Sequence, residues 1–185
     1  MVCQKYAAGQ RPGAEAARIY RFRLTVAGRC DDPSLRSRLR ELARRGGSNI
    51  VLRLEHVPDD DVSQLLAAAD VVVLPFRRAT TSGSAMLALS HGRPLIVPNL
   101  AALADLPDQA VLRYDGGVTA LAASVVRLAR ADADTLAAMS AAARDYAFQT
   151  TWQEIADRTT SEMVSILCDV PDTDVHSRAR QGYVK

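Results

Sequence analysis

The sequence predicts an α/β domain in which a Rossmann-like parallel sheet is flanked by helices. Short apolar runs alternate along the chain with longer segments of helical periodicity. With 185 residues, of which 48% are hydrophobic, the chain is long enough to build one domain with a substantial core. The clearest unit runs from Ala69 to Pro98, where two apolar strands enclose a polar loop and an apolar helix.

Five strands have the near-continuous apolar sequence of a buried parallel sheet. They are predicted at Phe22–Ala27, Ile50–Leu54, Val71–Leu74, Pro94–Val97 and Ala110–Tyr114. Gln4–Ala8 is a weaker sixth candidate because polar residues interrupt it. A parallel crossover needs a dozen or more residues, and Gly9–Arg21, with a two-turn helix at Ala14–Tyr20, barely provides them.

The helices begin at recognisable capping residues. Asp32 before Pro33 predicts the start of a helix on which Leu35, Leu39 and Leu42 share one face. Asp59 or Asp60 is expected to cap a helix that buries residues 62, 65 and 66. Further helices are predicted at Ala85–His91, Leu100–Leu106, after Gly117, at Asp134–Phe148 and at Thr151–Cys168. The polar residues 169–185 are predicted to form a disordered tail.

Composition excludes several classes of protein. A net charge of +2 is too small to favour nucleic acid or an anionic membrane as a partner. The scattered Cys3, Cys30 and Cys168 have no metal-ligand spacing and indicate a reduced compartment. No apolar run reaches the roughly 18 residues of a transmembrane span. We therefore expect a cytoplasmic protein with no metal or cofactor, and peripheral binding at the inner face of the membrane is left open.

The loop before the Ala85 helix has the composition of a phosphate site. Ser82, Gly83 and Ser84 stand at the helix N-terminus, which offers free N–H groups and the positive end of the helix dipole. In parallel sheets this end of a helix lies at the carboxyl edge of the strands, where ligands bind. Without further information, an ordinary capped helix explains the same residues.

The order of segments from Phe22 to Leu167 resembles the C-terminal, donor-binding domain of retaining glycosyltransferases of family 4, which have the GT-B fold. The resemblance is carried by VAGR, HVPDDDV, ADVVVLPF, TSGS and LALSHGRPLIVP. Its most specific part lies between Leu74 and Pro94, and the closest similarity is to a bacterial branch with a TSGS-type loop. The resemblance implies a UDP- or GDP-linked sugar as donor and an acceptor held by an N-terminal domain or a second chain.

The resemblance also implies a division of the chain into three regions. Residues 1–21 form a truncated first β-α unit, residues 22–168 the nucleotide-sugar-binding domain, and residues 169–185 the tail. In the family, the first strand of this domain lies between those matching Phe22–Ala27 and Val71–Leu74. We therefore expect Gln4–Ala8 at the centre of the sheet, or else a substitute strand, a partner chain or a rearrangement.

Site residues follow from the resemblance one by one. The residues expected to bind the donor diphosphate are Ser82, Gly83, Ser84, Gly28, Arg29 and Arg11. His56, Val57 and Leu87 are expected near the base and ribose of the nucleotide. No catalytic side chain is identified.

The sequence departs from the family pattern at three points. Ala79 and Leu87 occupy the places of two glutamates near the donor sugar and the ribose, and neither side chain accepts a hydrogen bond. The loop at Arg11 normally supplies an arginine and a lysine to the diphosphate, and here no lysine follows before Phe22. Each loss weakens the case for turnover.

Two functions are therefore compatible with the sequence. The first is hexosyl transfer from a nucleotide-sugar to a polysaccharide or glycolipid precursor, with this chain supplying the donor-binding domain. The second is a degenerate Rossmann-like module for binding or assembly, without turnover. The absence of a Walker loop and of a GxGxxG fingerprint argues against an NTPase or a dehydrogenase.

Overall fold

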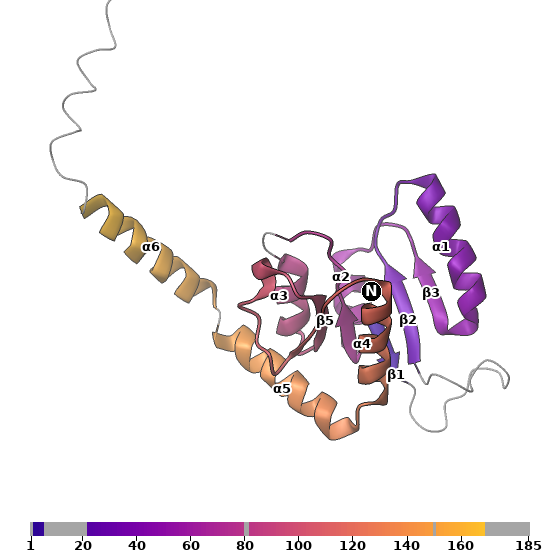
Figure 1. The fold of residues 1–185 in the computed structure, drawn as a ribbon. Coiled ribbons are helices and arrows are strands. Elements are labelled where there is room, and N and C mark those ends of the chain that lie inside the picture. The colour runs from indigo at the N-terminus through magenta and orange to yellow at the C-terminus, as the bar shows by residue number, and fades with distance from the viewer. Residues whose placement is uncertain (1, 6–21, 80–81, 150, 169–185) are drawn as a thin grey trace, which may run out of the picture. The chain divides into compact units, whose positions relative to one another are not determined.

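A computed structural model of the chain describes residues 2–5, 22–79, 82–149 and 151–168 (Figure 1). The chain divides into two compact units, Met1–Phe148 and Gln149–Lys185. The first unit contains the sheet, and the second contains helix α6 (Trp152–Cys168). The predicted tail lies outside the described residues, and the domain boundary near residue 168 stays a prediction.

Six described strands form one sheet in the order β3-β2-β1-β4-β5-β6. They are β1 (Val2–Lys5), β2 (Phe22–Ala27), β3 (Ile50–Arg53), β4 (Val71–Val73), β5 (Leu95–Pro98) and β6 (Val111–Tyr114). β2 pairs in parallel with β3, and β5 pairs in parallel with β4 and β6. The five strands predicted from apolar runs are therefore confirmed to within one residue at each end, and so is the α/β fold class.

The first strand lies at the predicted place but runs in the opposite direction. β1 sits between β2 and β4 and is antiparallel to both, with Val2 opposite Thr25 and Val72. It spans Val2–Lys5, so it begins before the predicted Gln4, and residues 6–8 of the predicted range lie outside the described residues. The prediction that this strand runs parallel to its neighbours is wrong. A reversed strand removes the need for a crossover from one end of the sheet to the other, for which the intervening segment is barely long enough.

The remaining helices mostly follow the predicted caps. They are α1 (Pro33–Gly46), α2 (Asp59–Ala67), α3 (Gly83–Ser90), α4 (Val118–Arg130) and α5 (Ala133–Gln149), with short 3₁₀ turns η1 (Gly47–Asn49) and η2 (Ala101–Leu103). Asp32 caps α1 as predicted, accepting hydrogen bonds from the N–H groups of Leu35 and Ser34, which lower the pKa of its carboxyl.

The start of one helix and the length of another differ from the predictions. Pro58, not Asp59 or Asp60, occupies the N-cap of α2, and the aspartates fall in its first turn. Their negative charges interact favourably there with the positive end of the helix dipole, so the aspartates stabilise the helix without capping it. The helix predicted at Leu100–Leu106 shrinks to η2.

The short η2 is held by Arg113 of β6. The guanidinium of Arg113 donates to the carbonyl oxygens of Leu106, Leu103 and Ala104 at 2.7, 3.1 and 3.2 Å. It also forms an ion pair with Asp108. These bonds satisfy carbonyl groups that a full helix would satisfy internally, which explains why the segment stays ordered after a single turn.

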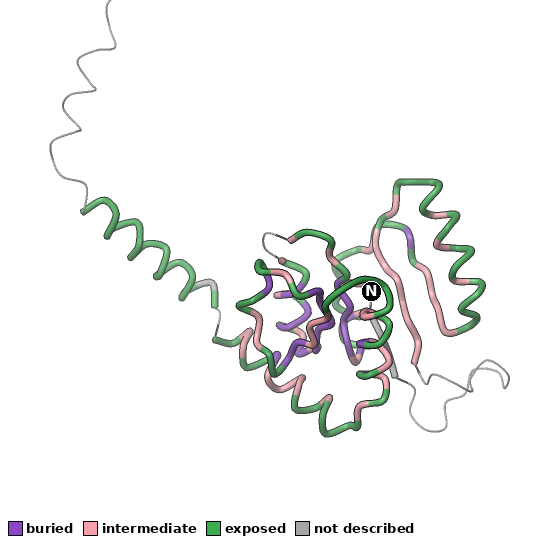
Figure 2. The backbone as a smooth tube through the Cα atoms, in the orientation of Figure 1, coloured by how far each residue is buried: buried purple, intermediate pink, exposed green. Residues whose placement is uncertain are grey.

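The core is concentrated around β4, β5 and α3, the region coloured purple in Figure 2. Alternate residues of β4 point to opposite faces of the sheet. Val72 and Leu74 belong to the cluster that packs with α3, whereas Val71 and Val73 pack with Leu128 of α4. The sheet is therefore buried on both faces at its centre.

The other end of the sheet is packed more loosely. All six residues of β2 are only half-buried, and no residue of α1 is buried. Leu35 and Leu42, two of the three leucines predicted to share one face of α1, are 46% and 50% exposed. Leu39, between them, is half-buried.

Gly92 offers a direct test of the packing at the end of α3. Its φ is +65°, and a Cβ there would come within 2.7 Å of the Arg144 side chain on α5. We expect Gly92→Ala to lower the free energy of unfolding by about 1–2 kcal/mol, because the left-handed backbone and the displaced arginine both cost free energy. Urea denaturation measures the change.

Gly83→Ala is the matched control. Gly83 lies in the first turn of α3, and nothing comes within 4 Å of the position of an added Cβ. This variant should be as stable as the wild type or about 0.5 kcal/mol more stable. Equal denaturation midpoints for the two variants would contradict the packing described for Gly92.

Candidate functional site

The carboxyl ends of five strands meet at one edge of the sheet. β2 and β3 are parallel, as are β4, β5 and β6, and β1 is antiparallel to both β2 and β4, so these five strands share one direction. The loops leaving this edge carry Gly28 and Arg29 after β2, His56 and Val57 after β3, and the segment that leads from β4 into α3. Open α/β sheets bind their ligands at this edge.

The N-terminus of α3 is capped and open. Ser82 is the N-cap, and its Oγ accepts a hydrogen bond from the Ala85 N–H at 3.0 Å. The first N–H groups of a helix, here those of Gly83 and Ser84, have no partner within the helix. Both residues are exposed, and α3 has no acidic residue in its first turn. The geometry therefore suits an anion held by backbone N–H groups.

Ser82 also keeps a group for a ligand. Its oxygen is engaged as an acceptor in the cap, but a hydroxyl has a proton to donate as well. The predicted roles of cap and ligand donor are thus compatible at this residue. Ser84, by contrast, stands exposed in the first turn of α3.

Gly28 and Arg29 lie at the same edge, after β2. Gly28 has a φ of +137°, and its N–H donates to the Arg53 carbonyl at 3.0 Å, which ties this turn to the end of β3. The Nε of Arg29 lies 2.8 Å from Asp31 Oδ1, and both side chains are largely exposed. Exposed pairs of this kind are weak, so an incoming anion can compete with Asp31 for the guanidinium.

The residues expected around the nucleotide are placed less tightly. His56 is exposed and Val57 half-buried in the turn before α2. Leu87 lies on α3 with 44% of its surface exposed. Ala79 packs against the cluster beneath α3. At the two positions where the resemblance implies glutamates, the chain thus offers an apolar surface.

Arg11 lies outside the described residues. The strand residues that flank its segment, Lys5 and Phe22, pair with each other at the amino end of β2. Lys5 and Phe22 therefore lie at the edge of the sheet opposite α3's N-terminus. The structure brings the other diphosphate candidates to the carboxyl edge and leaves Arg11 as a prediction.

Sequence reasoning missed four polar residues at the carboxyl edge. Asn99, after β5, donates from Nδ2 to Asp115 Oδ1 at 2.9 Å, and Asp115 follows β6. Arg77 and Arg78 are exposed in the loop between β4 and α3. The available signal was position, because each follows an apolar strand by at most a few residues.

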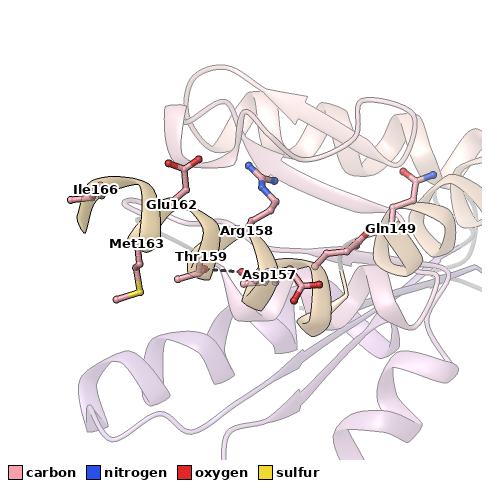
Figure 3. A pocket seen from close by; sticks show the side chains of 9 residues that line it. Gln149, Asp157, Arg158, Thr159, Glu162, Met163 and Ile166 are labelled. Atoms are coloured by element: carbon pink, nitrogen blue, oxygen red, sulfur yellow. Dashed lines mark hydrogen bonds between the residues drawn. The ribbon is translucent and has the colours of Figure 1, made fainter. Parts of the chain in front are cut away.

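A separate concavity of about 760 Å³ belongs to the second unit (Figure 3). It is lined by Gln149, Glu154, Ile155, Asp157, Arg158, Thr159, Glu162, Met163 and Ile166. Apart from Gln149 these residues belong to α6, and none is a predicted site residue.

The described residues contain neither a metal-binding cluster nor a helix that could span a membrane. No cluster of three or more histidine, cysteine, aspartate or glutamate side chains there could hold a metal ion. Within the same residues, every helix is too short or too polar to cross a bilayer.

Comparisons with known proteins agree with the fold class and identify a family. Residues 11–131, nearly two thirds of the chain, match the family model described as glycosyl transferases group 1. No curated protein matches the chain. Among solved structures, the catalytic domain of starch synthase IV from Arabidopsis thaliana, bound to ADP and acarbose, is similar with a TM-score of 0.55 and 14% identity, over 75% of this chain and 32% of that one.

A second solved structure is AviGT4, a glycosyltransferase involved in avilamycin A biosynthesis. It has a TM-score of 0.39 and 22% identity, over 69% of this chain and 42% of that one. The present chain spans about a third of the length of the starch synthase structure. At 14% identity, the similarity to the starch synthase concerns the fold.

The cap at Ser82 can be tested independently of any ligand. We expect Ser82→Ala to lower the free energy of unfolding by about 1 kcal/mol, because the Ala85 N–H loses its side-chain partner. Ser84 lies two residues after Ser82 and has no capping role, so Ser84→Ala should change the free energy of unfolding by less than about 0.5 kcal/mol. Chemical denaturation of both variants gives the comparison, and equal losses would argue against the cap.

Proposed function

Because the chain belongs to the glycosyl transferases group 1 family, whose model matches residues 11–131, we propose that it supplies the nucleotide-sugar-binding domain of a retaining glycosyltransferase of family 4. The proposed reaction is hexosyl transfer from a UDP- or GDP-linked sugar to a polysaccharide or glycolipid precursor, as in the bacterial branch with a TSGS-type loop. The observation that carries the proposal is the open N-terminus of α3 at the carboxyl edge of a Rossmann-like sheet.

The donor diphosphate is proposed to lie against Ser82, Gly83 and Ser84. Backbone N–H groups and the helix dipole suit its negative charge, and Gly83 leaves space for a close approach. Gly28 and Arg29 would border it from the neighbouring loop. The ADP in the similar starch synthase structure supports a nucleoside diphosphate as the class of ligand.

The chemistry proposed for these residues is electrostatic. Negative charge develops on the leaving diphosphate in the transition state of glycosyl transfer, and N–H donors aimed at it lower the barrier. This role needs neither a nucleophilic side chain nor a metal or organic cofactor. His56 and Val57 are proposed to border the base.

Turnover is proposed to require a further acceptor-binding domain or a second chain. In GT-B enzymes the reaction takes place between two domains, and this chain spans only about a third of the starch synthase structure it resembles. We propose that the protein works in the cytoplasm, with peripheral binding at the inner face of the membrane as the route to a glycolipid acceptor.

A second candidate function is a binding or assembly module without turnover. The observation that favours it is the apolar surface at Ala79 and Leu87, where the family has carboxylates that contact the donor. The two candidates separate on whether the chain binds a nucleoside diphosphate at all.

Titration of the chain with UDP, GDP and their sugars decides between them. A ligand at 100 times its Kd stabilises the folded state by about 2.7 kcal/mol, which raises the Tm of a domain of this size by about 5–10 °C. We expect such a rise with UDP or GDP and their sugars, and none with uridine or guanosine at equal concentration. No rise with any nucleotide at millimolar concentration would favour the module without turnover.

Ser82→Asp locates the binding. Aspartate caps a helix as well as serine does, so the fold should be as stable, but its carboxylate would repel a diphosphate at α3. We expect the thermal shift to be lost in this variant. Ser37→Asp adds the same charge at an exposed position of α1 and should bind like the wild type. Unchanged binding by Ser82→Asp would move the site away from α3.

The side chain at position 87 can be tested for contact with the ribose hydroxyl groups. A leucine side chain cannot accept a hydrogen bond, so the wild type should bind UDP, 2′-deoxy-UDP and 3′-deoxy-UDP with equal affinity. Leu87→Glu should bind UDP about tenfold more tightly than one of the deoxy analogues, which is the effect of one hydrogen bond to a charged group. Leu87→Met, without an acceptor, is the control. Discrimination against a deoxy analogue by the wild type would contradict this assignment.

A further inference from the structure

The stretch from Val71 to Ala104 contains no aspartate or glutamate, although the chain has 21 acidic residues. Its basic side chains are Arg77, Arg78, His91 and Arg93. His91 follows the last residue of α3, at the end of the helix away from the candidate site. Arg93 precedes β5 and donates to the Ala67 carbonyl at 3.1 Å. The positive charge of this stretch at the carboxyl edge thus rests on two residues, Arg77 and Arg78.

The loop that carries these two arginines is anchored on both sides of them. Phe76 and Ala79 are partly buried and pack against the cluster beneath α3, and the Phe76 N–H donates to the Leu74 carbonyl at 2.9 Å. Arg77 and Arg78 stand between these anchors and are exposed. The anchors keep both arginines at the carboxyl end of β4, on the path into α3.

Neither guanidinium is neutralised by a neighbour in the described part of the chain. Arg29 pairs there with Asp31, Arg36 with Glu55 and Arg113 with Asp108. No such pair or side-chain hydrogen bond is formed there by Arg77 or Arg78. Ala79 contributes to this, because a glutamate at that position would place a carboxylate next to Arg78 in the chain.

We propose that Arg77 and Arg78 hold the diphosphate of the donor, taking over the charge that the shortened loop after β1 has lost. The proposal rests on the proposed function, which puts that diphosphate at the N-terminus of α3. A nucleoside diphosphate brings two to three negative charges, and two guanidiniums match them with forked, charge-assisted hydrogen bonds. The reversed β1 strengthens the need for this replacement, since Lys5, its last residue, lies beside Phe22 at the opposite edge of the sheet.

The proposal makes Arg77 and Arg78 binding residues specific for phosphate. The double variant Arg77→Gln/Arg78→Gln should bind UDP or GDP, whichever binds the wild type, about tenfold to hundredfold more weakly, the usual effect of losing charge-assisted hydrogen bonds. The loss should be smaller for the matching monophosphate, which brings less charge. Isothermal titration calorimetry measures the affinities of the wild type and the double variant for the diphosphate and the monophosphate.

Two further variants make the result specific. Arg77→Lys/Arg78→Lys retains both charges and should keep most of the affinity. Arg38→Gln/Arg40→Gln removes the same two charges from exposed positions of α1 and should bind like the wild type. Circular dichroism and the Tm without ligand show that each variant is folded, which is expected because all four arginines are exposed.

The outcomes separate the two proposals. Binding by the wild type that is unchanged in Arg77→Gln/Arg78→Gln overturns the role of these arginines and leaves the proposed function standing. An equal loss in the α1 control also overturns it, since the effect is then one of net charge. If neither UDP nor GDP binds the wild type, the proposed function fails and the role of the arginines fails with it.

Discussion

The packing of α3 against β4 and β5 is the contact on which the rest of the structure depends. Ala85, Ala88 and Leu89 of α3 are fully buried, as are Leu95 and Val97 of β5. Burial of aliphatic side chains to this extent contributes about 1.5–3 kcal/mol for each large residue. The small alanine side chains allow α3 to pack closely against the sheet. This packing positions the N-terminus of α3 at the carboxyl edge.

That contact explains how the candidate site keeps its geometry with few polar side chains. Phe76 and Ala79, in the described part of the segment after β4, pack against the cluster beneath α3, and Ser82 caps the helix itself. The cap and the packing of α3 position the N–H groups of its first turn, and such preorganisation lowers the entropic cost of binding a ligand.

The electrostatic character of the edge differs from the family pattern in a consistent direction. Ala79 and Leu87 remove two acceptors suited to hydroxyl groups, whereas the helix terminus and the neighbouring arginines remain suited to phosphate. Under the proposed function, such a site would bind the diphosphate of the donor more strongly than the hydroxyl groups of its sugar and ribose. Binding and turnover are then separable properties, and selectivity for the sugar would come from residues outside this loop.

The sequence by itself determined the local elements, and the tertiary structure decided direction and exposure. Apolar runs located the five strands, and Asp32, Ser82 and Gly92 marked helix ends, because these signals act between residues close in the chain. The direction of β1 could not be read from its residues, since the same strand can pair either way and only β2 and β4 select one. The exposure of Leu35 and Leu42 likewise depends on packing between distant segments, which no local pattern records.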